Sequence, residues 1–309
     1  MMKKCLSFLL ALLLLSGCCG LFAVAAVEEP LPYPDSRFFS IGDYTLHYRV
    51  KEAAASKGQI LFLHGFFAST YCWEELTRIL SENGYTCVLV DLPDFGFSSR
   101  ETASTKKVKH ETVVHALMQS LSDQPWYLAG HSMGGFAALA LAQTYPDSVK
   151  NLLLYSSCGN NGWFRLLDPL TTNNTVASIA GSVIETLGQS RFLVKMLMHY
   201  ATQDRVYLRG YDFEKLRAPF CVAGTGAGIV RYLSMQTDTD YDAVRKMPPM
   251  LYINGDRDCV CPPTERIALR RAMPQGSTDV VLPGAGHMLI ESRAAEVAAL
   301  TLGFLAAHP

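Results

Sequence analysis

The chain has 309 residues, with 27 Lys plus Arg against 28 Asp plus Glu and a formal net charge of −1. This balance leaves no basic surface of the kind that nucleic-acid binding requires, so no nucleic-acid partner is expected. Apolar residues make up 49%, which excludes an intrinsically disordered chain, and charged residues only 18%, below the roughly 25% of an ordinary soluble protein. The apolar excess therefore has to be located along the chain.

Much of the apolar excess lies at the N-terminus. Lys3 and Lys4 precede the stretch Cys5–Val27, in which 19 of 23 residues are apolar. A basic start, an apolar middle and small residues at the end are typical of a secretory signal. We therefore expect residues 1–27 to be a signal peptide or an N-terminal membrane anchor. The protein would then be exported, and either secreted or tethered to the outer face of the cell membrane.

Three fates of this leader stay open. Its end, Ala23-Val24-Ala25-Ala26, offers the small side chains that ordinary signal peptidase accepts. Leu15-Ser16-Gly17-Cys18 instead resembles a bacterial lipobox, which would be lipidated at Cys18. Left uncleaved, the 23 residues Cys5–Val27 are long enough as a helix to span a hydrocarbon core of about 30 Å. No later stretch is long and apolar enough to predict a second span.

The cysteines indicate neither a disulfide framework nor a metal site. Nine are present, three in the leader and six at Cys72, Cys87, Cys158, Cys221, Cys259 and Cys261. Export permits disulfides, but the spacings suggest no framework, and buried free thiols explain the cysteines equally well. Cys259-Val260-Cys261 lacks the paired C-x-x-C knuckles of a zinc site, so no metal ligands are predicted.

After a Pro-rich tether at residues 28–37, short apolar strands alternate with helical patterns. Strands are predicted at 38–41, 44–50, 59–63, 86–90, 126–129, 151–155, 250–253 and 279–282, and helices at 71–81, 106–121, 133–145, 264–273 and 292–307. Continuous apolar strands such as Gln59–Leu63 are typical of a parallel sheet covered on both faces. The alternation predicts an α/β doubly wound core over residues 38–157 and 249–309.

The interval 158–248 breaks this rhythm and predicts a helical lid. It contains no clear strand, and helices are predicted at Val176–Leu187 and Phe192–Ala201. The second of these is apolar nearly all round, at Phe192, Leu193, Val194, Met196, Leu197 and Met198. Internal packing of the lid is favoured over a lipid-facing surface. The glycines of Gly224–Gly228 lack the spacing of a phosphate loop and predict close helix packing instead.

The motif that carries chemistry is G-x-S-x-G at Gly130–Gly134, which follows an apolar strand and opens a helix. A sharp strand-to-helix turn of this kind holds the central serine, Ser132, in a strained conformation that exposes its hydroxyl. The start of the following helix offers backbone N–H groups to an anion. Ser132 is therefore the predicted nucleophile.

A serine hydroxyl needs a base, and the base needs a carboxylate to orient it. Asp256 and Asp258 follow the predicted strand 250–253, and His287 follows the strand 279–282. Both loops are expected at the carboxyl edge of the sheet, where Ser132 also lies. His287 is the predicted base, and these residues alone leave the choice between the two aspartates open.

An oxyanion hole requires two N–H donors aimed at the developing charge. The N–H of Met133, directly after the nucleophile, is one candidate. The loop after the strand 59–63 reads His64-Gly65-Phe66-Phe67 and would supply the other, which we assign to the N–H of Phe66.

On these motifs the chain resembles the α/β-hydrolase superfamily, in the branch with H-G-F, D-L-P-x-F-G-x-S, G-H-S-M-G-G and G-x-G-H signatures, over about residues 38–307. The resemblance implies an eight-stranded, mostly parallel sheet, a lid inserted after the sixth strand, and no metal or cofactor. The family's G-x-x-D-x-x-x-P pattern fits Gly255, Asp258 and Pro262, which favours Asp258 as the acid. One departure is Asp94, where relatives often carry Gly, and this residue would either bend its loop or face solvent.

These features predict a serine hydrolase that cleaves carboxylic esters, such as acylglycerols or short-chain acyl esters, through a triad of Ser132, Asp258 and His287. The resemblance also admits C–C bond hydrolases, haloperoxidases, aminopeptidases and thioesterases. A serine nucleophile argues against haloalkane dehalogenases and epoxide hydrolases, whose nucleophile is Asp. The rival from another class is a non-catalytic binding protein on the same fold, but no member of the triad is missing.

Overall fold

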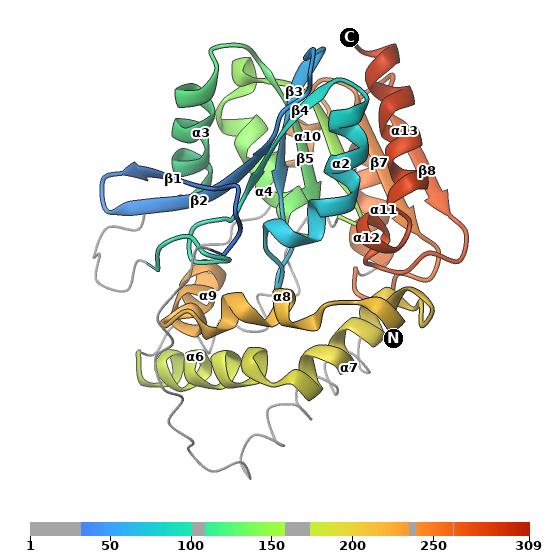
Figure 1. The fold of residues 1–309 in the computed structure, drawn as a ribbon. Coiled ribbons are helices and arrows are strands. Elements are labelled where there is room, and N and C mark those ends of the chain that lie inside the picture. The colour runs from blue at the N-terminus through green and yellow to red at the C-terminus, as the bar shows by residue number, and fades with distance from the viewer. Residues whose placement is uncertain (1–31, 101–108, 158–173, 235–238, 262) are drawn as a thin grey trace.

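The computed structural model describes residues 32–100, 109–157, 174–234, 239–261 and 263–309, and its centre is one eight-stranded sheet (Figure 1). The strands are β1 (Ser36–Ile41), β2 (Tyr44–Lys51), β3 (Gly58–Leu63), β4 (Tyr85–Val90), β5 (Trp126–His131), β6 (Val149–Tyr155), β7 (Met250–Gly255) and β8 (Thr278–Leu282). They lie in the order β1-β2-β4-β3-β5-β6-β7-β8. β2 pairs antiparallel with both β1 and β4, and every other pair is parallel. The predicted mostly parallel sheet is confirmed.

Helices cover both faces of this sheet. One face packs against α3 (His110–Leu121), α4 (Met133–Thr144) and α11 (Pro263–Ala272), and the other against α2 (Glu74–Glu82), α12 (Leu289–Ser292) and α13 (Ala294–Ala307). The side chains of β3 alternate between the two layers: Leu61 and Leu63 lie in the first core, Ile60 and Phe62 in the second. Burial on both faces explains why the central strands read as continuous apolar runs.

Several element boundaries differ from the predictions. The helix expected at 71–81 begins as the 3₁₀ turn η2 (Thr70–Trp73), because the Ser69 side chain accepts from the N–H of Tyr71, and continues as α2. The last helix is divided into α12 and α13 at Arg293. α3 begins at His110, and the residues 101–108 before Lys109 lie outside the described chain.

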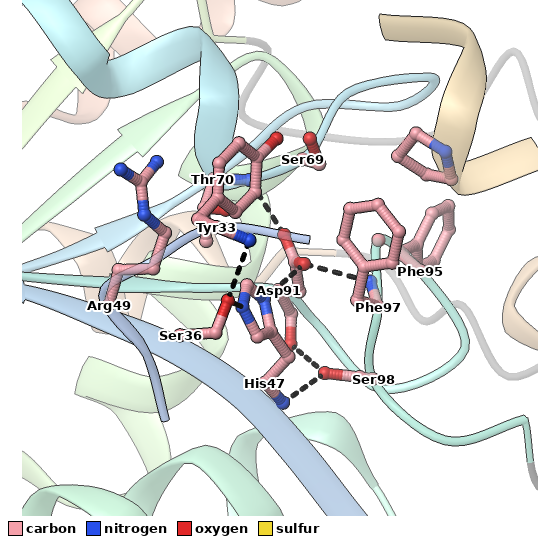
Figure 2. A network of polar contacts seen from close by, with 12 residues as sticks. Tyr33, Ser36, His47, Arg49, Ser69, Thr70, Asp91, Phe95, Phe97 and Ser98 are labelled. Atoms are coloured by element: carbon pink, nitrogen blue, oxygen red, sulfur yellow. Dashed lines mark hydrogen bonds and ion pairs between the residues drawn. The ribbon is translucent and has the colours of Figure 1, made fainter. Parts of the chain in front are cut away.

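The C-terminal part of the predicted tether 28–37 belongs to the core, so the boundary set at residue 38 is wrong. β1 already begins at Ser36, and Tyr33 is buried. The ring of Tyr33 packs against Phe97 and lies beneath the guanidinium of Arg49, 4.1 Å from its carbon (Figure 2). An aromatic anchor within a Pro-rich stretch thus attaches the segment. Residues 28–31 and the predicted leader lie outside the described residues, as does Cys18.

Between β6 and β7 the described residues, 174–234 and 239–248, form helices and no strand; we call them the helical insertion. Its elements are α6 (Asn174–Gln189), α7 (Arg191–Thr202), η5 (Tyr207–Gly210), α8 (Phe213–Arg217), η6 (Ala218–Cys221), α9 (Thr225–Ser234) and α10 (Tyr241–Val244). α6 and α9 cross at Gly181 and Gly226, where a side chain on Gly226 would overlap the Gly181 carbonyl. For Gly226 the prediction of close helix packing is confirmed.

The apolar residues of α7 divide between interior and surface. Val194 and Met198 are buried in a cluster with Met288 of the core, as internal packing predicts. Phe192 is 73% exposed, so for this residue the prediction of internal packing is wrong. Within the part of the chain that the structure describes, no helix has the length and apolar character needed to span a membrane.

The described cysteines are mostly unpaired. Cys72 and Cys87 are buried free thiols, and Cys221 is an exposed one. Cys261 is disulfide-bonded. The sequence left both states open, and both occur.

Candidate active site

Four loops meet at the carboxyl edge of the parallel strands, on the side that carries the helical insertion (Figure 1). They follow β3, β5, β7 and β8, and they contain in that order the predicted oxyanion loop, Ser132, Asp258 and His287. The structure therefore brings together residues that lie up to about 220 positions apart in the chain.

Ser132 occupies the turn between β5 and α4 with φ 53° and ψ −119°, a backbone conformation that residues with a side chain rarely adopt. Its N–H donates to the carbonyl of Tyr155 at 3.0 Å, which fixes the turn against β6. A side chain on Gly130 would contact the backbone of Gly134, and one on Gly134 would overlap the carbonyl of Leu63. Both glycines of the motif are therefore required by close backbone approach, and the strain presents Ser132 at the turn's apex.

His287 is paired with Asp258, whose Oδ2 lies 3.0 Å from the imidazole Nδ1. Burial alone would raise the pKa of Asp258, but the charge and hydrogen bond of His287, with the N–H groups of Val260 and Cys261, outweigh it and lower the pKa to about 2. Asp258 therefore stays ionised at neutral pH and orients the imidazole. Asp256 is exposed and instead accepts from the N–H of Gly284, which supports the turn before His287.

The Ser132 hydroxyl makes no hydrogen bond to His287 in the described structure. His131, which directly precedes Ser132 in the chain, packs against His287, and the centroids of the two imidazole rings are 4.8 Å apart. Catalytic hydrogen bonds of this type commonly shorten only when substrate is bound.

The backbone of His287 is held at both of its polar groups. Its N–H donates to the carbonyl of Ala201 in the last turn of α7 at 2.8 Å. Its carbonyl accepts from Nε2 of His131, at 2.9 Å. Gln203, in the left-handed conformation with φ 56° and ψ 16°, ends α7 directly after this contact. His287 is thus held by the loop of Asp258, by His131 at the end of β5 and by the helical insertion.

His131 is a residue for which no role was predicted. Burial, and secondarily the charge of His287, lower the pKa of His131 to about 3. His131 is therefore neutral, and the carbonyl that it contacts requires the proton on Nε2. Its place within the G-H-S-M-G-G motif was visible, but its partner lies 156 positions away.

The predicted oxyanion loop lies against Ser132. A Cβ on Gly65 would stand 3.0 Å from the Cβ of Ser132. The carbonyl of Gly65 accepts from Nδ1 of His64 at 2.8 Å, because Nε2 of His64 accepts from the N–H of Leu92. In a trans peptide the N–H of Phe66 points opposite to that carbonyl, and so away from His64. Met133 supplies the second predicted donor as the first residue of α4, where N–H groups lack intrahelical partners.

An aromatic wall runs from this loop to the insertion. The rings of Phe66 and Phe67 are 4.7 Å apart, and Phe67 stacks on Phe220 of η6 at 4.8 Å. The surroundings of the oxyanion loop are therefore apolar, which suits an acyl group better than a charged one.

Asp94 does not face solvent, so that alternative is wrong. It is buried with φ 71°, and it pairs with Arg231 of α9, whose Nε lies 3.0 Å from Oδ2. Burial alone would raise the pKa of Asp94, but His110 and Arg231 outweigh it and hold the pKa below its usual range. Arg100, nearby, donates to the hydroxyl of Thr225 at the start of α9. The departure from the family pattern thus ties the core to the insertion.

Another buried carboxyl, that of Glu291, lies four residues after His287 and was not predicted. The hydroxyl of Tyr207 in η5 donates to its Oε2 at 3.1 Å. Burial raises the pKa of Glu291 to about 8, although the nearby hydroxyls of Tyr211 and Tyr207 counteract it. Glu291 thus makes a further contact between the core and the insertion.

Asp258, Cys261 and His287 offer possible ligand atoms within 4.8 Å of one another. The residues present do not fit a metal ion well, because Cys261 is disulfide-bonded and the other two are hydrogen-bonded together. No step of the chemistry is assigned to a metal.

A second Ser–His–Asp array lies at the start of the fold (Figure 2). Ser36 Oγ is 2.8 Å from Nε2 of His47, and Nδ1 of His47 is 2.7 Å from Asp91 Oδ2. Asp91 also accepts from the N–H groups of Thr70 and Phe97, at 2.6 and 2.8 Å. This array joins β1, β2 and the loops after β3 and β4.

Comparison with known proteins agrees with this geometry. The family model described as alpha/beta hydrolase fold matches residues 58–294, which is more than half of the chain. The chain belongs to the alpha/beta hydrolase fold family. The match includes the turn of Ser132 and the loops of Asp258 and His287.

Among curated proteins, the chain is similar to monoacylglycerol lipase abhd6-B of Xenopus laevis, at 29% identity over 126 residues. That match covers 40% of this chain and 37% of the lipase, so the chain spans little more than a third of the length of this relative. It is also similar to the pimeloyl-(acyl-carrier protein) methyl ester esterase of Xylella fastidiosa, at 26% identity over 81% of this chain and 96% of the esterase.

Solved structures show the same fold. Cfl2 from Burkholderia cenocepacia has a TM-score of 0.70 at 21% identity, covering 87% of this chain and 95% of Cfl2. A membrane phospholipase A described as a bacterial virulence factor has a TM-score of 0.68 at 20% identity, covering 88% and 86%. At these identities the likeness concerns the fold.

Proposed function

We propose that the protein is a serine hydrolase that cleaves carboxylic esters through an acyl-enzyme. The observation that carries the proposal is the strained Ser132 turn, which stands beside a histidine held by a buried, ionised Asp258. The triad residues are Ser132, His287 and Asp258. Esterases and lipases among the relatives support an ester as the substrate.

In this mechanism the Ser132 hydroxyl attacks the acyl carbon while Nε2 of His287 takes its proton. The carbonyl oxygen becomes an oxyanion, which accepts from the N–H groups of Phe66 and Met133. Asp258 stabilises the imidazolium and keeps the proton of Nδ1 in place. His287 then protonates the leaving alcohol, and the bond between that oxygen and the acyl carbon breaks.

Deacylation reverses these roles. Water attacks the acyl-enzyme, gives a proton to His287 and forms a second oxyanion in the same site. Collapse of this intermediate releases the carboxylic acid and returns the proton to Ser132. Every proton moves between substrate, water, Ser132 and His287, so the reaction balances with residues of this chain alone.

The apolar wall of Phe66, Phe67 and Phe220 supports an apolar acyl group, such as that of an acylglycerol or a short-chain ester. The insertion would act as a lid, because its Phe220 stacks on the oxyanion loop and its α7 supports His287. The composition of residues 1–27 supports export, with the protein secreted or held at the outer face of the cell membrane.

The decisive experiment is labelling with a fluorophosphonate probe, which reacts with activated serines. We expect labelling of the unchanged protein and its loss in Ser132→Ala. No labelling, or labelling that survives this substitution, would show a non-catalytic binding protein or another nucleophile. A panel of p-nitrophenyl esters of increasing chain length, compared with amide and thioester analogues, then identifies the bond and the acyl group.

A further inference from the structure

The outer surface of the helical insertion is unusually apolar. Three side chains on it, Phe192, Val206 and Ile179, are 73, 71 and 61% exposed, and they are the most exposed large apolar residues in the described chain. Val176, 38% exposed, lies one turn before Ile179 on α6. We call these four residues, with the basic residues described below, the α6–α7 face. α6 and α7 follow one another along the side of the insertion that points away from the sheet (Figure 1).

α7 exposes Phe192 although it already buries another apolar side. On that side Val194 and Met198 join the cluster with Met288. Val206 is held outward by a defined turn, in which Asp204 Oδ1 accepts from the N–H groups of Val206 and Tyr207 at 3.0 Å each. The apolar surface is therefore a fixed feature of the fold.

Basic residues flank Phe192 and Val206 along the chain. From residue 191 to 209 the chain carries four, and all four residues are exposed: Arg191, Lys195, Arg205 and Arg209. The single acidic residue in this stretch is Asp204, whose carboxylate is occupied by the turn. Arg191 also pairs with Glu214 of α8. Exposed apolar side chains set among excess positive charge are the composition of an interfacial surface for anionic lipid.

The chain enters the folded domain at the edge that carries this insertion. Tyr33 packs beside the array of Ser36, His47 and Asp91, and Asp91 follows the carboxyl end of β4 (Figure 2). Only residues 28–31 separate the apolar leader, which ends at Val27, from the first described residue, Pro32. An extended chain of this length reaches at most about 15–20 Å. A leader held in a membrane would therefore keep this edge of the domain close to the bilayer.

We propose that the α6–α7 face docks onto an anionic lipid bilayer, so that the catalytic edge of the sheet faces the membrane. The inference goes beyond the proposed ester hydrolysis and needs no assumption about how the leader is processed. Phe192, Val206 and Ile179 would enter the boundary between headgroups and acyl chains, and Lys195, Arg205 and Arg209 would contact lipid phosphates.

The test places a fluorescent reporter on the face. The full chain carrying Phe192→Trp is mixed with vesicles of phosphatidylcholine and an equal amount of phosphatidylglycerol, in which some acyl chains are brominated. We expect the added Trp emission to shift to shorter wavelength and to be quenched by the brominated lipid. The matched control is Leu121→Trp, because Leu121 ends α3 shortly before β5 begins, at the opposite edge of the sheet. Unchanged protein corrects for the native tryptophans.

A second variant tests the charges. Lys195→Gln with Arg205→Gln should lower the partition onto the anionic vesicles by roughly fivefold for each charge removed, with little effect on pure phosphatidylcholine. Arg271→Gln, at an exposed position near the end of α11, is the matched control and should leave binding unchanged. Hydrolysis of a water-soluble ester by each variant shows whether the catalytic site is intact, which separates this inference from the proposed function.

Three results would overturn the proposal. The first is quenching that is equal for the two tryptophan positions, or absent for Phe192→Trp while the protein still sediments with vesicles, since another face would then meet the membrane. The second is no binding to either kind of vesicle. The third is self-association in solution that Phe192→Glu abolishes, which would identify a second copy of the chain as the occupant.

Discussion

The described residues contain two Ser–His–Asp arrays whose histidines lie at similar distances from their aspartates. His287 lies 3.0 Å from Asp258, and His47 lies 2.7 Å from Asp91. Only the second array also has its serine hydrogen-bonded to the histidine, at 2.8 Å between Ser36 and His47. The first array is nevertheless the candidate catalytic one.

The difference lies around the serine. Ser132 has a strained backbone with φ 53° and begins a helix, whereas Ser36 begins an edge strand and its Oγ accepts from the N–H of Tyr33. Asp91 accepts from two backbone N–H groups and also contacts His47. The side chains of Asp91 and His47 are fully buried. A hydrogen-bonded Ser–His–Asp line can thus serve to fasten strands together. Catalysis by a serine requires in addition an accessible hydroxyl, a strained turn that presents it, and N–H donors for the oxyanion.

Replacing each serine in turn should give the largest difference between the two arrays. We expect Ser132→Ala to lower kcat for a p-nitrophenyl ester on the order of 10⁶-fold, because the nucleophile is lost. Ser36→Ala should keep kcat within about twofold and reduce the free energy of unfolding by about 1 kcal/mol, the value of a typical hydrogen bond. Steady-state kinetics and urea unfolding measure the two effects. Residual activity that depends on Ser36 would show that the second array is also catalytic.

The next largest effect concerns the acid. Asp258→Asn should lower kcat about 10⁴-fold, because the amide favours the wrong tautomer of His287 while preserving the shape of the site. Asp256→Asn is the matched control and should remain near full activity, since Asp256 contacts only the turn at Gly284. The kcat values of the two variants show which aspartate is the acid. If the loss followed Asp256 instead, our assignment of the acid would be wrong.

A smaller effect tests the mounting of the base. His131→Asn should lower kcat roughly 10- to 100-fold with little change in KM, because its amide is too short to reach the His287 carbonyl and the base loses alignment. His131→Gln carries an N–H at about the position of Nε2 and should restore most of the activity. Equal kcat values for the two folded variants would remove His131 from the positioning of His287.

The smallest effect on turnover is expected at Glu291. This buried carboxyl is contacted by tyrosines, whereas Asp258 is contacted by a histidine. Its pKa in the folded protein, about 8, lies above the value of about 4.5 for an exposed glutamate, so the folded state holds the proton more tightly. Stability from this group is complete below about pH 4.5 and is lost as pH rises towards 8. Glu291→Gln should flatten this dependence and raise Tm at pH 9 relative to the unchanged protein. Calorimetry at pH 6 and pH 9 tests this, and a steeper dependence in the variant would contradict it.

The sequence predicted the sheet, and it pointed to the candidate site residues, because both depend on local patterns. Buried strands are continuous apolar runs, and Ser132 lies within a motif of five residues whose first glycine closely approaches the backbone of the last. The contact of His287 with Asp258 followed from their common place at the carboxyl edge of the sheet.

The features that were missed join distant segments through groups that composition does not reveal. His131 and Ala201 act on the backbone of His287, and a carbonyl has no signature in the sequence. Tyr33 was assigned to the tether because the prolines beside it dominate the local pattern. Asp94 could be recognised as unusual, but its partner Arg231 lies 137 positions away.

The carbonyl of Ala201 has a consequence for how such an enzyme can change. The α7 helix of the insertion begins at an exposed surface, and its last turn supports the backbone of His287. A transplanted insertion must therefore keep an acceptor at position 201 and a left-handed residue at position 203. The first turn of α7 is open to adaptation, and the last turn is constrained by the reaction.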